Sequence, residues 1–378
     1  MTEYPRVKRN ILLNPGPATT TDTVKYAQVV PDICPREKEF GAVMKQLGGD
    51  LLKVVHAPAD AYTAVLFCGS GTLCIDACVS SLVPAGKKIL VCSNGSYSAR
   101  AAEAARCSHV DCIELKLPTD RPVDTARVRM ELEQDRDIAV VYCCMHETGT
   151  GVLNPVRELG ALAHEFGCTM VADTTSTYAM IPIRMEEDNL DFIMASAQKG
   201  LQGMTGLSFV IGRTDLLEAS ASYPTHSYYT NLYLQYSFIR DKGEMHFTPP
   251  VQTIYAARQA MAEYFAEGEE AKWARHRAVW EALRAGTERL GLRPAFDPAN
   301  TSRLVLCLRY PKDPAFDFTK LHDFLYERGF TIYPGKVTDD PMFRVCSLGA
   351  LTTEDIEAFC SCLESAFRSL GIRVPCVY

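Results

Sequence analysis

The chain has 378 residues, of which 47% are hydrophobic and 22% are charged, and its formal net charge is −7. This composition is typical of a globular enzyme, and the negative charge without a long basic block argues against a nucleic-acid partner. No apolar run approaches the ~20 residues that span a bilayer and the start "MTEYPRVKRNILLNPGP" lacks a signal-peptide core, so we expect a cytoplasmic protein without a membrane partner.

Apolar strand-like runs alternate with helical patterns from residue 60 onward. Strands are predicted at 62–68, 88–94, 138–144, 169–175, 192–197 and 206–212, with a glycine-terminated helix at 158–167 among the intervening segments. Continuous apolar strands separated by helices predict a parallel or mixed sheet that is buried on both faces. In such sheets ligands bind beyond the carboxyl ends of the strands, which is where the polar clusters of this sequence fall.

The C-terminal third reads as a separate unit. One long helical stretch over about 250–291 carries both tryptophans and is expected to link two domains. Strands at 302–310, 330–336 and 342–348 and helices at 318–328 and 353–370 then predict a compact α+β unit. We expect a large domain over residues 15–265 and a small C-terminal domain over 266–378 that also includes residues 1–14.

The fifteen cysteines are many for a chain of this length, and most lie in apolar sequence. Their number is odd, and no pair of C-x-x-C motifs or Cys/His cluster has zinc-like spacing. We therefore expect buried free thiols rather than disulfides, and no metal site. The thiols in question are Cys68, Cys74, Cys78, Cys92, Cys143, Cys144 and Cys307.

Lys199 raises the first question of chemistry, because in "IMASAQKGLQG" it directly follows an apolar run. A lysine beside buried sequence is costly unless it is paired, neutral or covalently used, and the simplest alternative is an exposed loop lysine. Asp173 ends an earlier strand in "MVAD" and, taken singly, resembles a helix cap or turn residue. Together the two favour pyridoxal phosphate, which uses a Schiff-base lysine and an acidic partner for its ring nitrogen.

Three further segments follow predicted strands. In "CGSGTLCID" the glycines, Ser70 and Thr72 precede a helix start and suit a phosphate, although a plain helix cap explains them about as well. Tyr97 in "SNGSYSAR" is placed to stack on a flat cofactor, or is simply a half-buried tyrosine. Thr148 in "HETGTG" is placed beside the same ring, although threonine is common in such turns.

Two arginines and one turn are candidates for binding an anionic substrate. Arg344 lies within the apolar strand "FRVCSLG", where an unpaired guanidinium is expensive and a substrate anion would pair with it. Arg36 has Glu37 and Glu39 as neighbours and is either a substrate residue or an ordinary salt-bridge partner. The amides of "NPGP", from Asn14 through Gly16, are able to reach an anion, or form only a turn.

The ordered set of motifs resembles the class V pyridoxal-phosphate aminotransferases. The motifs are "LNPGP", "GSGT", "SNGSY", "ETGTG…LNP", "VADTTST", "SAQKGLQG", "HFTPP" and "IYPGK…FRVCSLG", and they extend over about residues 10–370. No single motif is specific, but the set in this order is. The resemblance implies a large domain with a mixed seven-stranded sheet, a small C-terminal domain, and a homodimer with its active sites at the interface.

The resemblance also implies roles for individual residues. Lys199 would carry the cofactor as an imine and Asp173 would face the pyridine nitrogen, while Tyr97 stacks on the ring and Thr148 bonds its 3′-oxygen. Cofactor-binding positions near the phosphate or the lysine are Ser70, Gly71, Thr72 and Gln198, with Thr248 of "HFTPP" reaching the phosphate of the neighbouring subunit. Arg344, Arg36, Asn14 and Gly16 are the expected substrate-binding positions.

Within the family, the motifs are most similar to enzymes that transfer the amino group of 2-aminoethylphosphonate to pyruvate, giving phosphonoacetaldehyde and alanine. Gln198 in place of asparagine, Gly149 in place of threonine and the segment "DICPREKEF" depart from that pattern and leave the amino donor open. The sequence does not determine the physiological direction either. An alanine–glyoxylate or serine–pyruvate aminotransferase is one alternative. A class V lyase or desulfurase using Cys346 is a second, and a non-catalytic ligand-binding dimer is a third.

Overall fold

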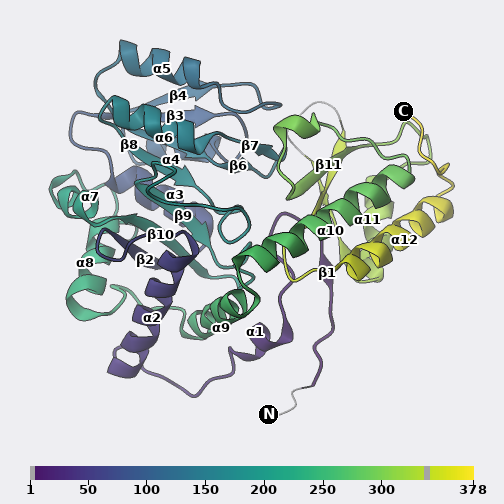
Figure 1. The fold of residues 1–378 in the computed structure, drawn as a ribbon, viewed down its shortest axis with the longest axis horizontal. Coiled ribbons are helices and arrows are strands. Elements are labelled where there is room, and N and C mark those ends of the chain that lie inside the picture. Colours follow the sequence, from purple (N-terminus) through teal and green to yellow (C-terminus); the bar gives the residue numbers. More distant parts are fainter. Residues whose placement is uncertain (1–4, 336–340) are drawn as a thin grey trace.

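The structure is a computed structural model, and it describes residues 5–335 and 341–378. Two lobes are visible in Figure 1: a large one built on a central sheet, and a smaller one that contains the C-terminus. Helix α10 (Glu269–Arg289) runs from the large lobe into the small one.

The large lobe contains a seven-stranded mixed sheet in the order β2-β10-β9-β8-β5-β3-β4. Its strands are β2 (Tyr62–Cys68), β3 (Lys88–Ser93), β4 (Cys112–Lys116), β5 (Ile138–Cys144), β8 (Thr169–Asp173), β9 (Phe192–Ser196) and β10 (Leu207–Arg213). Strand β10 is antiparallel to both of its neighbours, and the remaining pairs are parallel. This confirms the predicted sheet, although β4 was not predicted as a strand, because this short edge strand is mostly half-exposed and carries alternating charge.

Helices cover both faces of this sheet, as its continuous apolar strands require. One face packs against α2 (Lys38–Val54), α5 (Thr125–Gln134), α6 (Val156–Glu165) and α9 (Val251–Glu267). The other packs against α3 (Gly71–Ser81), α4 (Ala99–Cys107), α7 (Thr214–Ala219) and α8 (Leu232–Lys242), with a short 3-10 turn η1 (Ser220–Ser222) between the last two. A small hairpin of β6 (His146–Glu147) and β7 (Val152–Leu153) follows β5.

The small lobe is built from α10 and a three-stranded antiparallel sheet in the order β11-β14-β13. Its elements are η2 (Pro298–Asn300), β11 (Val305–Arg309), α11 (Phe318–Glu327), β12 (Phe330–Thr331), β13 (Tyr333–Pro334), β14 (Met342–Cys346) and α12 (Thr353–Ser369). They enclose a separate apolar core. The predicted boundary between the two domains, after residue 265, stays a prediction. Residues 1–4 of the predicted small domain and Lys336 of the predicted strand 330–336 lie outside the described residues.

The predicted continuous helix over 250–291 is wrong. Gly268, at φ +83°, separates α9 from α10. A positive φ cannot continue an α-helix, and glycine adopts it without steric cost. The break lets α9 pack on the sheet while α10 crosses to the small lobe.

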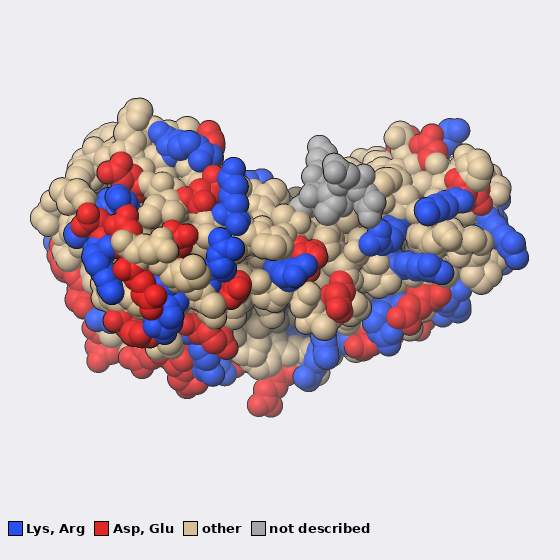
Figure 2. Space-filling model, turned by 90° about the horizontal axis from the view of Figure 1, so that it is seen from above, with Lys and Arg blue, Asp and Glu red and all other residues tan. Residues whose placement is uncertain are grey.

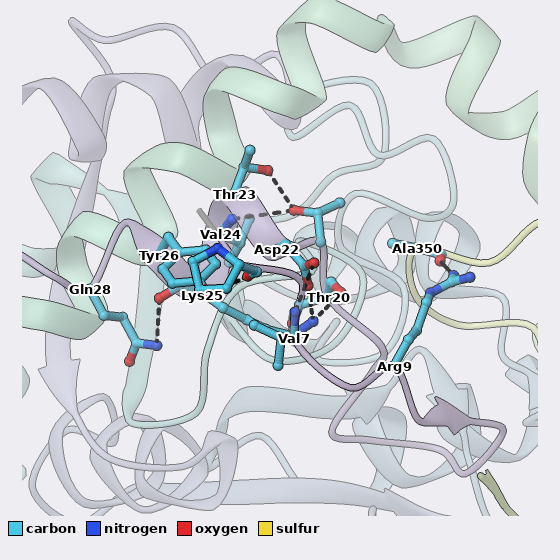
Figure 3. A network of polar contacts seen from close by, with 12 residues as sticks. Val7, Arg9, Thr20, Asp22, Thr23, Val24, Lys25, Tyr26, Gln28 and Ala350 are labelled. Atoms are coloured by element: carbon cyan, nitrogen blue, oxygen red, sulfur yellow. Dashed lines mark hydrogen bonds and ion pairs between the residues drawn. The ribbon is translucent and has the colours of Figure 1, made fainter. Parts of the chain in front are cut away.

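The N-terminal segment connects the two lobes and passes the site. Strand β1 (Ile11–Leu12) pairs with β12 of the small lobe, and Arg9 donates to the carbonyl oxygen of Ala350 at 2.6 Å. The chain then reaches α1 (Asp22–Tyr26), where Asp22 accepts from Lys25 at 2.8 Å and from the backbone of Val7 (Figure 3). Between these anchors the Ala18 amide donates to the carbonyl oxygen of Gln198 at 2.8 Å, which places the "NPGP" turn beside Lys199.

The surface charges are interspersed. Figure 2 shows lysine and arginine side chains among acidic ones over both lobes of the face in view. Within the described ranges, no helix has the length and apolarity that crossing a membrane requires.

All fifteen cysteines are free, as predicted. Nine are buried, and of the seven thiols expected to be buried only Cys68 is half-exposed. Burial raises the pKa of the thiols of Cys74 and Cys92 to about 12, so these side chains are neutral and pack as small apolar groups. The described residues contain no cluster of three or more potential metal ligands.

Candidate active site

The candidate site is a cavity of about 190 Å³ at the carboxyl ends of the sheet strands. Residues following β2, β3, β5, β8 and β9 line it together with the N-terminal turn. A larger open hollow of about 700 Å³ lies elsewhere, around Tyr62 and Asp191. Chemistry rather than volume distinguishes the smaller cavity, because the predicted lysine and carboxylate, Lys199 and Asp173, and the predicted phosphate-binding residues Ser70, Gly71 and Thr72 all line it.

Lys199 follows β9 and is 9% exposed. Its Nζ lies 5.4 Å from the centroid of the Tyr97 ring, and in the described part of the chain it forms no ion pair with a carboxylate. Gly16 packs directly against its stem: a Cβ built on Gly16 would lie 2.9 Å from Lys199 Cε. The lysine is therefore held in a narrow slot with its amine directed at an aromatic ring, and the prediction of an ordinary exposed loop lysine is excluded.

Asp173 ends β8, the strand adjacent to β9, and is 5% exposed. Its Oδ1 accepts from the amide of Thr175 at 2.8 Å, and its Oδ2 accepts from the hydroxyl of Tyr142 at 3.5 Å. Both contacts are to neutral groups, so the carboxylate has no cationic partner in the described chain. A buried carboxylate of this kind is suited to a protonated ring nitrogen.

The predicted phosphate cradle lies at the start of α3. Ser70 is its N-cap residue, and Gly71 and Thr72 form its first turn, where free amides and the helix dipole favour an anion. A Cβ on Gly71 would lie 3.1 Å from Thr175 Oγ1 and 3.5 Å from Ser196 Oγ. Glycine thus leaves room where two hydroxyls approach the helix start.

Tyr97 is positioned by a buried glutamate. The carboxylate of Glu147 accepts from the amides of Tyr97 at 3.1 Å and Ser98 at 2.6 Å, and burial raises the pKa of this carboxyl group. Gly95 lies against it, since a Cβ there would come within 2.4 Å of the Glu147 carboxyl. Glu147 therefore fixes the turn that presents the tyrosine ring to the cavity.

His146 also lines the cavity and is fully hydrogen-bonded. Its Nδ1 lies 2.8 Å from Ser176 Oγ and its Nε2 lies 2.8 Å from Ser302 Oγ. Burial, assisted by the charge of Lys199, lowers the pKa of His146 to about 3, so the imidazole is neutral. It connects the cavity wall to the segment that enters the small lobe.

Arg344 on β14 of the small lobe is not a lining residue of the cavity, but its guanidinium contacts Thr148, which is one. Its guanidinium donates twice to the carbonyl oxygen of Pro334, at 2.9 and 3.2 Å, and once to that of Thr148 at 3.2 Å. No carboxylate pairs with it among the described residues. Its charge is thus oriented by neutral backbone groups and remains available to an anion.

Asn14 and Gly16 lie in the turn that crosses the cavity. The Asn14 amide nitrogen donates to the carbonyl oxygen of Pro17 at 3.1 Å, and its buried Oδ1 has no partner. Gly16 lines the cavity, and its φ of +128° is one that residues with a side chain rarely adopt.

Two predicted residues are not brought to the cavity of a single chain. Arg36 pairs with Glu244 at 2.7 Å and donates to the carbonyl oxygen of Met245, so the neighbouring acids Glu37 and Glu39 are not its partners. Thr248 is exposed in the loop before α9. Their predicted roles would require a second subunit.

Sequence reasoning overlooked several lining residues, among them His146, Arg100, Thr175, Ser176 and Ser196. Each of them ends a strand or follows one whose carboxyl end had been predicted to form the site. The rule that ligands bind at the carboxyl ends of strands therefore pointed to these segments. What it lacked was orientation, because a one-residue change along a strand or turn moves a side chain to the opposite face.

The cavity fits the predicted cofactor, pyridoxal 5′-phosphate. Four buried polar atoms of its walls have no hydrogen-bond partner: Thr148 Oγ1, Thr175 Oγ1, Ser196 Oγ and Gln198 Oε1. Buried polar groups are almost always paired in native proteins. A ligand that carries an anionic group and a polar ring satisfies such a set, and Lys199 and Asp173 offer the amine and the carboxylate that this cofactor uses.

Comparison with known proteins identifies the class. The family model described as aminotransferase class-V matches residues 22–353, so the chain belongs to the class V aminotransferases. 2-Aminoethylphosphonate–pyruvate transaminase 2 of Polaromonas sp. (strain JS666) is 33% identical over 363 residues, covering 96% of this chain and 97% of its own length. The 2-aminoethylphosphonate–pyruvate transaminase of Klebsiella pneumoniae is 34% identical over 363 residues, which is 94% of this chain and 97% of its own length.

The fold is shared with solved structures of the same class. The alanine–glyoxylate aminotransferase of Nostoc sp. superposes with a TM-score of 0.88 at 23% identity, covering 97% of this chain and 98% of that one. At this identity the likeness establishes the fold alone. The family model thus confirms the predicted family, and the superposition confirms the predicted fold.

Proposed function

We propose that the protein is a pyridoxal-phosphate enzyme that transfers the amino group between 2-aminoethylphosphonate and pyruvate. The near-full-length relatives that carry this name support the proposal. The observation that carries it is Arg344: among the described residues its guanidinium has no carboxylate partner, and it is oriented by three hydrogen bonds to the carbonyl oxygens of Pro334 and of Thr148, a cavity residue.

The bound cofactor supplies an electron sink that allows a proton to be removed from the carbon bearing the substrate amine. The chain supplies the groups that hold this cofactor. Lys199 Nζ provides the covalent attachment, and the Asp173 carboxylate holds a proton at the ring nitrogen. Ser70, Gly71 and Thr72 would bind the phosphate, and Thr148 would bind the ring hydroxyl.

Lys199 also moves the proton. With cofactor and substrate bound, its free amine would be the base that takes the proton from the substrate carbon and later gives it back. The narrow slot beside Gly16 restricts the swing of the side chain and so limits the positions that Nζ can take. His146, a neutral imidazole with both nitrogens bonded to serines, acts as a rigid wall rather than as the base.

The anionic end of the substrate binds Arg344. In 2-aminoethylphosphonate the amine lies two carbons from the phosphonate, so the cation must stand away from the reacting carbon. Gly16 of the N-terminal turn lines the cavity, and Arg344 of the small lobe contacts Thr148, another lining residue, through its carbonyl oxygen. Pyruvate would place its carboxylate on the same guanidinium in the second half of the reaction.

The competing activities make different demands on the chain. A lyase or desulfurase would need a mobile thiolate, whereas Cys346 is fully buried in β14 and burial raises the pKa of its thiol. An alanine–glyoxylate type of aminotransferase would use the same residues with a substrate carboxylate on Arg344, and substrate tests distinguish the two activities.

We also propose a homodimer in which Thr248 and Arg36 serve the partner's site.

The experiment compares turnover of 2-aminoethylphosphonate, alanine and serine, each with pyruvate or glyoxylate. We expect 2-aminoethylphosphonate with pyruvate to give the highest kcat/KM, and the K199A variant to lose both turnover and the visible absorbance of the lysine-bound cofactor. Faster turnover of alanine or serine would assign the alternative. Persistence of the band in K199A would remove Lys199 from its role.

A further inference from the structure

Arg100 is a cation at the active-site cavity to which no role has yet been given. It lies in the first turn of α4, one turn beyond Tyr97, and lines the same cavity as Lys199. Its Nη1 donates to Thr72 Oγ1 at 3.1 Å, and its Cζ lies 4.4 Å from the centroid of the Tyr97 ring. It therefore joins the start of α3 to the ring expected to stack on the cofactor.

Its charge is not neutralised by the acids around it. Asp76, one turn along α3, accepts from Thr230 at 2.8 Å. Glu103, one turn along α4, pairs with Arg106 at 2.7 Å. Among the described residues Arg100 forms no ion pair, so its guanidinium holds only a hydroxyl and a ring face and has donors left for an anion.

Neutral donors converge beside it. In the first turn of α3 the Leu73 amide donates to the carbonyl oxygen of Ser70 at 2.9 Å, and the amides of Gly71 and Thr72 precede any helical acceptor. The hydroxyls of Thr175 and Ser196 lie next to Gly71 without hydrogen-bond partners of their own. Ser196 is 1% exposed, so water does not satisfy it in place of a ligand. These groups make a pocket for a tetrahedral oxyanion.

Charge balance then requires a cation at this end. A phosphate monoester carries ≈ −1.5 to −2 charges at pH 7. Within one chain's described residues, the positively charged side chains lining the cavity are Lys199 and Arg100, since His146 is neutral. The amine of Lys199 is committed to the ring. Of these two side chains, Arg100 is the one that hydrogen-bonds to the start of α3, through Thr72.

We propose that Arg100 binds the phosphate of the cofactor, together with Thr72 and the start of α3. Arg344 of the small lobe then binds the substrate anion, so each of the two arginines binds one anion. This assignment rests on the proposed function, because it takes pyridoxal phosphate as the cofactor.

The test compares two ligands that differ only in the phosphate. Protein freed of cofactor is titrated with pyridoxal 5′-phosphate and with pyridoxal, and the visible absorbance of the lysine-bound form gives each Kd. Three variants are compared with the wild type: R100M, R100K and R106M. Arg106 is the matched control, because it lies on the same helix, is exposed and is paired with Glu103 and Glu114.

We expect R100M to weaken pyridoxal 5′-phosphate binding by roughly 10- to 100-fold, as for loss of a charged hydrogen bond, and to leave pyridoxal binding within about twofold. R100K should recover part of the loss, because lysine keeps the charge but not the fork geometry. R106M should match the wild type for both ligands.

Three results would overturn the assignment while leaving the proposed function intact. They are an unchanged Kd for pyridoxal 5′-phosphate together with an unchanged KM in R100M, an equal loss for both ligands, or a raised KM for 2-aminoethylphosphonate with an unchanged Kd for the cofactor. The second would make Arg100 a support for the Tyr97 ring, and the third would make it a substrate residue. A wild-type protein that gives no band with either ligand would instead remove the proposed cofactor, and this inference with it.

Discussion

Replacing Gly16 with alanine tests how the N-terminal turn controls Lys199. Gly16 has a φ of +128°, and the added Cβ would lie 2.9 Å from Lys199 Cε and 3.1 Å from its Cγ. Carbon atoms in contact prefer about 3.5–4.0 Å. The stem of Lys199 is the flexible partner, so the lysine has to yield rather than the backbone.

Two separable costs follow. Relief of the contact needs a shift of about 0.6–1.1 Å in the lysine stem, and a misplacement of about 1 Å at a reacting group costs on the order of 100-fold in rate. A side chain at a strongly positive φ costs of order 1–3 kcal/mol in stability. We therefore expect G16A to lose about 100-fold in kcat while it remains folded.

The assay measures kcat with 2-aminoethylphosphonate and pyruvate, the visible band, and urea unfolding of the same samples. The control is G167A, because Gly167 also has a positive φ, +72°, but nothing lies within 4 Å of its Cβ position. G167A should show the loss of stability and keep its turnover. Wild-type turnover in G16A, or an equal loss of kcat in G167A, would refute the argument that Gly16 positions the lysine.

Three other changes have distinct expected outcomes. R344Q should raise the KM for 2-aminoethylphosphonate by roughly 10- to 100-fold in steady-state assays, because a charged contact is lost. R344K should be intermediate, and the visible cofactor band should stay unchanged in both variants. A normal KM in R344Q would exclude Arg344 as the anion site. G49A should stabilise α2 by about 0.5–1 kcal/mol in urea unfolding, because no atom lies within 4 Å of the position that a Cβ on this helical glycine would take; destabilisation would contradict the open space. The thiols of Cys74 and Cys92, with pKa values raised from 9.0 to about 12, keep their protons on folding. Their contribution to stability is complete below pH 9, and each loses about 1.4 kcal/mol per pH unit above it. Urea unfolding at pH 8 and pH 10 under reducing conditions should show this loss, and C92A should reduce it; a slope unaffected by C92A would remove that thiol as a cause.

The sequence pattern was sufficient to predict which chemically active side chains stand at the carboxyl ends of the strands. Lys199, Asp173, Tyr97 and Thr148 each follow or end an apolar strand, and parallel strands that lie side by side bring their carboxyl ends to one edge. For the same reason the sheet, its burial and the free thiols were predictable. These properties depend on local hydrophobicity and on a topological rule that holds for every such sheet.

Orientation and long-range pairing required the tertiary structure. Arg36 has acids on either side in the sequence, yet its partner is Glu244, 208 residues away. The break at Gly268 was hidden inside a helical pattern, because a single glycine is compatible with a helix until packing on two lobes demands a turn.

The sequence by itself determined which residue types stand at the ends of the strands, and with them the class of reaction. Only the tertiary structure decided how these residues face one another: Gly16 against the stem of Lys199, Arg344 on the carbonyl oxygen of Thr148, and Arg100 on Thr72. The physical reason is that hydrophobic periodicity is a local property of the chain. The direction of a buried charge, by contrast, is set by the polar groups that distant segments bring to it.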